Sequence, residues 1–371
     1  MNSSSFELLK NQFQLDPNFI YLNHGSFGAC PKPIFEERSK WQIEIEKQPV
    51  SFIEDKAIGL LDWSRQELAS FIHCDKDDMV YFPNPTTAMN MVIRSLDLKP
   101  GDEIICPSWT YVATAEAAAI LGVKTVMCDV DPNTFNVSSK YIEPLITKKT
   151  KAIVPVHFTG YMTDMRKLLP IAEKHGLKVV EDACQSILGA IDGKNAGTWS
   201  QAGAFSLHPL KNLNVWSDGG LIVTNDDELA ERMNLHRSHG VTREQHLMTH
   251  KPDGPWYYQQ IALGYNYRMN ELQAALGITQ MERLDSFIAR RHEIAERYDD
   301  LLMKLPITTP WQHPDGKSSF HLYIIRLNLE SLDRSKQQVF EYLREQGVGV
   351  NIHYIPVHTQ PFYKNIGFKK G

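Results

Sequence analysis

The sequence is poor in cysteine, has no long apolar run and carries no block of basic residues. Its five cysteines lie far apart and include no Cys-x-x-Cys pair, so we predict neither a disulfide framework nor a zinc or redox motif. It has no run of about eighteen apolar residues, and the N-terminus lacks a basic start followed by an apolar core. We therefore expect a protein of the reducing cytoplasm that is neither exported nor inserted into a membrane.

The distribution of charge excludes a further class of partner. The chain has 39 basic and 44 acidic residues, giving a net charge of -5, and they are scattered along its 371 residues. A surface that binds nucleic acid needs lysine and arginine clusters that neutralise a row of phosphates, so we do not expect nucleic acid as a partner. The 14 histidines show no ligand spacing, and we predict no metal site.

The chain does contain enough apolar material for a large core, because 42% of its residues are hydrophobic. We predict three parts: an N-terminal segment (1–75) that packs on a large domain, the large domain itself (76–265), and a linker helix with a small α+β domain (266–371). The chain stops soon after the small domain begins to close, so we expect a final helix beyond Gly371.

Short β-branched runs alternate with helical stretches between residues 76 and 240, which predicts an α/β fold with a mostly parallel sheet covered by helices on both faces. The predicted strands are 79–82, 103–106, 124–128, 152–156, 178–181, 203–206 and 220–224. Apolar residues at helical spacing predict helices over 86–96, 111–121 and 165–175. Ligands of such sheets bind beyond the carboxyl ends of the strands.

The remainder of the chain gives weaker signals. Residues 241–260 have few periodic apolar positions and are predicted to form a long surface loop. A helix of about thirty residues is predicted after Asn270. In the small domain we predict strands over 319–327 and 348–354 and a helix over 336–346.

Two residues at the predicted crevice suggest its chemistry. Asp182 follows the apolar run 177–180, which places its carboxylate at a strand end, and Lys211 lies in a polar segment after the strand 203–206. Pyridoxal phosphate requires a carboxylate that pairs with its pyridine nitrogen and an amine that forms an imine with its aldehyde. The plainer alternatives are a helix-capping aspartate and a surface lysine.

Other residues are candidates to hold the same cofactor. Thr86 and Thr87 begin a predicted helix, where free amides and hydroxyls form an anion site, although threonine is also a common helix cap. Ser206 can donate its hydroxyl to the phosphate from the strand that precedes Lys211. Tyr111 is either an aromatic that stacks on the ring face or a core residue.

Residues beyond the large domain's sheet supply further candidates. Asn266 and Arg268 end the long loop in a segment with little reason to be buried, and they would reach an anion in a neighbouring subunit. His353 is either a substrate contact or a plain strand histidine.

Taken in order, these motifs resemble the DegT-type nucleotide-sugar aminotransferases, which are fold-type-I pyridoxal phosphate enzymes. The segments that carry the resemblance are 99–104, 107–114, 129–136, 181–185, 205–213, 264–269 and 353–358. The resemblance implies that Lys211 forms the Schiff base with the cofactor and that Asp182 pairs with the pyridine nitrogen. It also implies that Gln185 lies by the ring.

The resemblance further implies which residues bind the rest of the cofactor. Thr86, Thr87 and Ser206 would bind its phosphate. Tyr111 would stack on its ring. Asn266 would reach the partner's cofactor across the interface of a homodimer with shared active sites.

The sequence departs from this pattern in two ways. Pro85 stands where the family usually has a glycine, which removes one backbone donor from the phosphate site. The stretch 21–28, together with Trp41 and 48–52, resembles instead the class V branch, which includes epimerases and desulfurases of amino acids. Such an N-terminal segment commonly lines the substrate side of the pocket. Asn23 and His24 therefore join Arg268 and His353 as candidate substrate-binding residues.

We expect a transaminase that moves an amino group from an amino acid, by resemblance L-glutamate, to a keto sugar that is expected to be nucleotide-linked. Lys211 would act as the base that moves a proton between substrate and cofactor. One alternative keeps the cofactor but catalyses epimerisation, elimination or desulfuration of an amino acid. Another is a regulatory protein that binds the cofactor without turnover.

Overall fold

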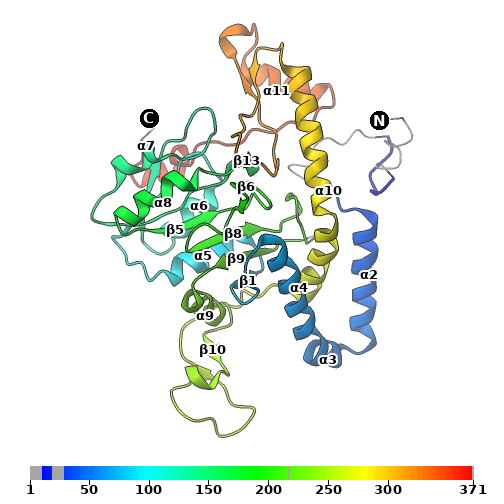
Figure 1. Ribbon diagram of the computed structural model, residues 1–371, viewed down its shortest axis with the longest axis vertical. Helices are drawn as coiled ribbons and strands as arrows, with labels where there is room; N and C mark the ends of the chain where they lie inside the picture. Colours follow the sequence, from blue (N-terminus) through cyan, green and yellow to red (C-terminus); the bar gives the residue numbers. More distant parts are fainter. Residues whose placement is uncertain (1–10, 19–28, 216, 370–371) are drawn as a thin grey trace.

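A seven-stranded sheet lies at the centre of the computed structural model, which describes residues 11–18, 29–215 and 217–369 (Figure 1). Its strands are β1 (Met79–Phe82), β2 (Glu103–Pro107), β3 (Lys124–Cys128), β4 (Thr150–Ile153), β5 (Lys178–Asp182), β8 (Ala202–Ser206) and β9 (Gly220–Thr224). They are arranged in the order β1-β9-β8-β5-β4-β2-β3. All seven predicted strands are confirmed, with small shifts at their ends.

The sheet is mostly parallel. Strand β9 runs antiparallel to both of its neighbours, β1 and β8, and every other adjacent pair in this sheet is parallel. Strands buried on both faces are continuous apolar runs, and every residue of β1 and β9 is buried. The carboxyl ends of β5 and β8 lie side by side, because Asp182 is in register with Ala204. This edge holds the candidate site.

Helices cover both faces of the sheet and form two hydrophobic cores. Successive strand residues point to opposite faces, so Val179 is buried in one core and Val180 in the other. The first face is covered by α4 (Ala57–Ile72), α8 (Met165–Lys174) and α10 (Glu271–Leu302), and the second by α5 (Pro85–Ser95), α6 (Val112–Ala119) and α9 (Asp227–His236). The three helices predicted within the large domain are confirmed.

The longest described helix, α10, extends from the large domain to the small one (Figure 1). It begins with a capping box, in which the side chains of Asn270 and Gln273 accept each other's backbone amide hydrogens at 3.0 and 3.2 Å. Helix α2 (Lys32–Lys47) and α4 pack along it, joined by α3 (Pro49–Ser51) and a π-helical turn, Phe52–Lys56. The predicted long helix is confirmed at 32 residues, while the division of the chain into three parts stays a prediction.

Residues 241–260 project from the large domain as the predicted surface loop (Figure 1). Its two ends pair as β10 (Val241–Thr242) and β11 (Gln259–Gln260). A 3-10 turn at Gln245–Leu247 lies between them, shortly after β10.

Short elements connect the C-terminal part of the chain to the region around the central sheet. Strand β13 (Gly316–Lys317) pairs with β6 (Ala190–Ile191), which pairs in turn with β7 (Lys194–Asn195). The remaining short elements are α7 (Ser139–Ile142), α12 (Pro361–Asn365) and 3-10 turns at Glu143–Leu145, Phe158–Gly160, Leu329–Ser331 and Val357–Thr359.

The small domain differs most from the sequence prediction. Its helix α11 (Lys336–Glu345) is confirmed, but the strands predicted over 319–327 and 348–354 are wrong. Within these ranges, which the structure describes in full, strand pairing is confined to β14 (Arg326–Leu327), opposite β12 (Ile307–Thr308).

The reason is that groups from other elements bind the backbone of both segments. Arg291 of α10 donates to the carbonyl oxygens of Phe320 (2.8 Å) and His321 (3.3 Å). The indole of Trp109 donates to the carbonyl oxygen of His353 at 3.2 Å. Carbonyl groups that are bound in this way are not free to form a ladder with a neighbouring strand.

No helix in residues 11–18, 29–215 and 217–369 combines the length and apolar character that a membrane span needs.

Glu181, the residue before Asp182, is a completely buried carboxylate that holds two loops against the end of β5. It accepts five hydrogen bonds, from the amides of Gly197 (2.8 Å), Trp199 (2.9 Å) and Ser200 (3.0 Å), the Ser200 hydroxyl (2.9 Å) and His157 Nε2 (2.9 Å). Because the amide of Thr163 donates to His157 Nδ1 at 3.1 Å, the imidazole proton that faces Glu181 is on Nε2. These donors compensate the cost of burying the charge.

Replacing Glu181 with glutamine should destabilise the fold. Glu181→Gln replaces one carboxylate oxygen with an NH2 group, which cannot accept from the donors that face it. Each lost hydrogen bond to a charged acceptor is worth about 1.5–3 kcal/mol. We expect the free energy of unfolding, measured by urea denaturation, to fall by about 3 kcal/mol. The control Glu173→Gln, at an exposed position of α8, should change it by less than about 0.5 kcal/mol. Equal stability of the two variants would contradict this role.

Candidate functional site

Asp182 and Lys211 lie near each other at the carboxyl edge of the sheet, close enough for the carboxylate to influence the amine electrostatically. Asp182 ends β5 with only 8% of its surface exposed. Its Oδ2 accepts from the Thr114 hydroxyl at 2.7 Å, and its Oδ1 accepts from the amide of Cys184 at 3.2 Å. No helix follows, because residues 183–189 form turns, so the helix-cap alternative for Asp182 is wrong. Within the described chain this carboxylate has no ion-pair partner closer than 4.0 Å and accepts only from neutral groups.

Lys211 lies in the turns after β8, and its side chain is half-buried rather than fully solvated. Burial lowers the pKa of its amine, while the neighbouring Cys184 and Asp182 oppose that shift. The structure therefore brings the predicted amine and carboxylate into one electrostatic environment. An amine with a lowered pKa is neutral more often, and the neutral form is the nucleophile.

Strand register brings the predicted phosphate-binding residues together. Gly220 pairs with Ser206 on one side and with Phe82 on the other, so Ser206 lies near the loop that leads from β1 into α5. A Cβ at Gly220 would lie 2.5 Å from the carbonyl carbon of Asn84, and only glycine permits this close approach. Ser206 is buried, and its oxygen accepts from the amide of His208 at 3.3 Å, which leaves its proton free to donate.

Some of the hydrogen-bond donors at the start of α5 are already bound by the N-cap residue, Asn84. Asn84 accepts the Thr87 amide with its side chain (2.8 Å) and the Thr87 hydroxyl with its carbonyl oxygen (2.9 Å). Thr86, by contrast, has no protein partner for its amide or hydroxyl within the described residues. Pro85, at the first helical position, supplies no amide hydrogen. Thr86 therefore has its amide and hydroxyl available to bind an anion. Thr87 can bind one only after it releases its hydrogen bonds to Asn84.

Aromatic and amide groups line the same edge. Tyr111 is 59% exposed, so the core alternative is wrong, and its ring centroid lies 6.3 Å from that of Tyr354. Gln185 is held by two hydrogen bonds: its Oε1 accepts from the amide of Thr159 (2.8 Å), and its Nε2 donates to the Tyr354 hydroxyl (3.2 Å). His353 lies outside any strand, and both burial and the nearby Lys211 lower its pKa.

The remaining candidates lie elsewhere. Asn266 and Arg268 are exposed, and Asn266 forms a bridge with Ser238. Arg268 lies close enough to Arg237 to help lower the pKa of that buried guanidinium to about 10, with burial as the main cause. Neither residue interacts with the groups around Lys211 within the described chain. The predictions for Asn23 and His24 fall outside the described residues.

Several residues at the site were missed by the sequence analysis. Thr114 lies one helical turn after Tyr111, and that spacing was the signal that places both at the start of α6. Tyr354 directly follows His353 in the chain. Nothing in the sequence indicated that Asn212 and Ser319 would meet across the domains at 2.7 Å.

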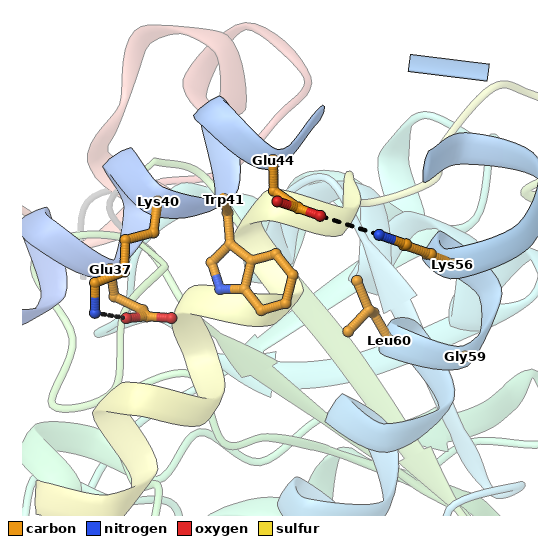
Figure 2. Close-up of a pocket in the computed structure, with 7 residues that line it drawn as sticks. All are labelled: Glu37, Lys40, Trp41, Glu44, Lys56, Gly59 and Leu60. Atoms are coloured by element: carbon orange, nitrogen blue, oxygen red, sulfur yellow. Dashed lines mark hydrogen bonds and ion pairs between the residues drawn. The ribbon is translucent and has the colours of Figure 1, made fainter. Parts of the chain in front are cut away.

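A surface groove of about 570 Å³ lies between α2 and α4, away from these residues (Figure 2). Trp41 and Leu60 line its floor, and the ion pair between Glu44 and Lys56 spans it at 3.0 Å. None of the predicted site residues contributes to it. The groove is wide open to solvent and offers no titratable group with the properties of a catalytic site.

The residues at the sheet edge fit pyridoxal phosphate. They offer an unpaired buried carboxylate, an amine with a lowered pKa, a free amide and hydroxyl at a helix start, and an exposed aromatic ring. Together with the mostly parallel sheet between two layers of helices, they define a pyridoxal phosphate enzyme of fold type I.

The chain belongs to the DegT/DnrJ/EryC1/StrS aminotransferase family, whose model matches residues 65–371. It is therefore a pyridoxal-phosphate-dependent aminotransferase of the sugar aminotransferase family. This confirms the predicted family, fold class and cofactor, and it favours transamination over epimerisation or elimination.

Individual relatives agree with this assignment. The chain is 35% identical to the spore coat polysaccharide biosynthesis protein SpsC of Bacillus subtilis (strain 168), over 77% of this chain and 74% of that protein. It is 34% identical to GDP-perosamine synthase of Caulobacter vibrioides, over 79% of this chain and 76% of that enzyme. The PLP form of the sugar aminotransferase Spr1654 from Streptococcus pneumoniae has a TM-score of 0.75 at 26% identity, covering 83% of this chain and 81% of that one.

The lowered pKa of Lys211 has a consequence for stability. The unfolded chain holds this proton more tightly, so the free energy of unfolding of the cofactor-free protein should rise with pH, from the lowered pKa up to the unfolded value of about 10.4. Lys211→Met removes this contribution and should be more stable than the wild type at neutral pH. The difference should shrink toward about pH 10.

Urea denaturation of the cofactor-free proteins at several pH values measures this difference. Lys148→Met, which changes an exposed lysine, is the control, and its free energy of unfolding should change with pH as that of the wild type does. If the free energy of unfolding of Lys211→Met also follows the wild type at every pH, the pKa of the Lys211 amine is not lowered.

Proposed function

We propose that this protein transfers an amino group from L-glutamate to a nucleotide-linked keto sugar, as a homodimer that binds pyridoxal phosphate. The observation that carries the proposal is the proximity, at one edge of the sheet, of the Lys211 amine, whose pKa burial lowers, and the Asp182 carboxylate, which has no described ion-pair partner. When bound, the cofactor supplies an electron sink for the carbanion that forms when the substrate loses its proton.

Asp182 keeps its negative charge available for the cofactor's ring. The Thr114 hydroxyl and the Cys184 amide each donate to one of the two carboxylate oxygens and hold the group in place. We assign this carboxylate to the pyridine nitrogen, where its charge keeps that nitrogen protonated. The bonds from Thr114 and Cys184 orient the group before the cofactor arrives.

Lys211 has two tasks in sequence. Its neutral amine would hold the cofactor through Nζ until an amino donor displaces it. The freed Nζ would then act as the base that moves a proton from the substrate carbon to the aldehyde carbon of the cofactor. Partial desolvation favours the neutral amine that both tasks require.

The other contacts follow from position. We assign the phosphate to Thr86 and Ser206, with Thr87 joining after it releases Asn84. Tyr111 would stack on the ring face, and Gln185 would lie by the ring. The loss of one amide at Pro85 is compatible with this site, because the Thr86 amide and hydroxyl remain free.

The substrate and partner assignments rest on position and relatives. His353, near Lys211, is assigned to the substrate. Asn266 and Arg268 are exposed away from their own site, which supports a role at the partner's site in a homodimer. The name of GDP-perosamine synthase supports a nucleotide-linked acceptor. The five cysteines are all unpaired, as expected in the cytoplasm.

The visible absorption spectrum of the purified protein tests the cofactor and the donor together. With pyridoxal phosphate, the wild type should show a visible band that L-glutamate abolishes, because the cofactor takes up the amino group. Lys211→Ala should lack the band of the lysine-bound cofactor and lose transaminase activity by at least about a thousandfold. A wild-type band that no amino donor changes would contradict transamination.

The acceptor is tested in the reverse direction. The enzyme is supplied with 2-oxoglutarate and either a GDP-linked or UDP-linked amino sugar or the same sugar without its nucleotide. We expect glutamate to form at least about a hundredfold faster, by kcat/KM, from a nucleotide-linked sugar, because the nucleotide contributes binding energy. Equal rates from free and linked sugars would contradict a nucleotide-linked substrate.

A further inference from the structure

Ser319 lies where the small domain meets the candidate site. It is completely buried, and three of its groups form hydrogen bonds with the large domain. Its amide donates to the carbonyl oxygen of Gly160 at 2.9 Å. Its hydroxyl donates to the carbonyl oxygen of Gln185 at 3.0 Å, and its carbonyl oxygen accepts from Asn212 Nδ2 at 2.7 Å.

These three partners come from loops that follow adjacent strands. Gly160 follows β4, Gln185 follows β5 and Asn212 follows β8, and the order of these strands in the sheet is β8-β5-β4. Asn212 is the neighbour of Lys211, and Gln185 is three residues after Asp182. Ser319 thus joins the loop of the candidate amine to the loop that leaves the candidate carboxylate.

Ser319 packs so closely against Gly160 that no side chain fits at position 160. A Cβ at Gly160 would lie 2.4 Å from Ser319 Oγ, and this glycine has a φ of +97°, which other residues rarely adopt. Behind Ser319, His292 of α10 bonds the carbonyl oxygen of Ser318 at 2.8 Å, and Arg291 of α10 bonds that of Phe320 at 2.8 Å. Helix α10 therefore fixes the segment from one side while Ser319 binds the loops on the other.

We propose that Ser319 is a positioning residue that sets the distance between Lys211 and Gln185. The proposal rests on the function proposed above, because the distance between the two residues matters for activity only if both contact the same cofactor. Without the hydroxyl, the buried carbonyl oxygen of Gln185 loses its donor, and a buried acceptor left without a partner is unfavourable. The loop of Gln185 then relaxes independently of the loop of Lys211.

The test compares Ser319→Ala with Ser318→Ala. Ser318 is also buried, but its hydroxyl oxygen accepts only the local amide of Phe320, at 3.0 Å. Both variants lose one buried hydroxyl next to each other in the chain, so they control for the general cost of the substitution. Neither residue is assigned a contact with cofactor or substrate.

Three measurements are made. Hydrogen exchange of the cofactor-free protein over residues 183–189 and 207–215 reports on the two loops. Titration with pyridoxal phosphate gives the cofactor affinity. The pH midpoint of the visible band reports on the amine of Lys211, and a purely structural defect would not shift it.

For Ser319→Ala we expect about tenfold faster exchange over residues 183–189, about tenfold weaker cofactor affinity and a shifted pH midpoint. Exchange over residues 207–215 should change by less than about twofold, because Asn212 still donates to the backbone carbonyl of residue 319. Ser318→Ala should change each quantity by less than about twofold. Wild-type values for Ser319→Ala, or equal changes in the two variants, would overturn the proposal.

A second variant keeps the test decisive if Ser319→Ala does not fold. Asn212→Ala removes the bond between the loop of Lys211 and the backbone carbonyl of Ser319, and it should give about tenfold faster exchange in residues 207–215. Unchanged exchange there would overturn the proposal. Exchange in the cofactor-free protein needs no cofactor, so a wild type that fails to bind pyridoxal phosphate refutes the proposed function without affecting this measurement.

Discussion

The burial of two consecutive carboxylates at the end of β5 is the constraint on which this structure depends. Glu181 is charge-compensated from every side by backbone amides, a hydroxyl and His157, and it fixes the loops around it. Asp182 points to the opposite face of the sheet and receives only enough hydrogen bonds to orient it. One carboxylate therefore ties loops to the end of β5, while its neighbour has no described ion-pair partner and is the one that we propose for the cofactor.

The sheet and the centre of the site could be predicted from the sequence because both depend on short-range patterns. Strands such as 79–82 and 220–224 are continuous apolar runs between polar segments, which is typical of strands buried on both faces. Asp182 and Ser206 end such runs, and the carboxyl ends of parallel strands meet at one edge. Lys211 follows one of these strands closely, so its position required little knowledge of the tertiary structure.

The small domain could not be predicted in the same way. Segments 319–325 and 348–354 have the composition of strands, yet side chains that are distant in sequence bind their backbone, including Arg291 and Trp109. Tertiary contacts override β propensity there. The same limit applies to Ser319, whose partners lie in three different loops. Local sequence patterns do not reveal which backbone groups will be bound by another domain.

The close packing at two glycines limits how this site can be redesigned. Gly160 and Gly220 each bring a loop against another chain segment with no space for a side chain, so these two positions tolerate little change in sequence. Tyr111, by contrast, is exposed, and packing restricts the exposed residues around it far less. Engineering of this chain, and natural divergence among relatives, should therefore spare the two glycines and concentrate on exposed positions.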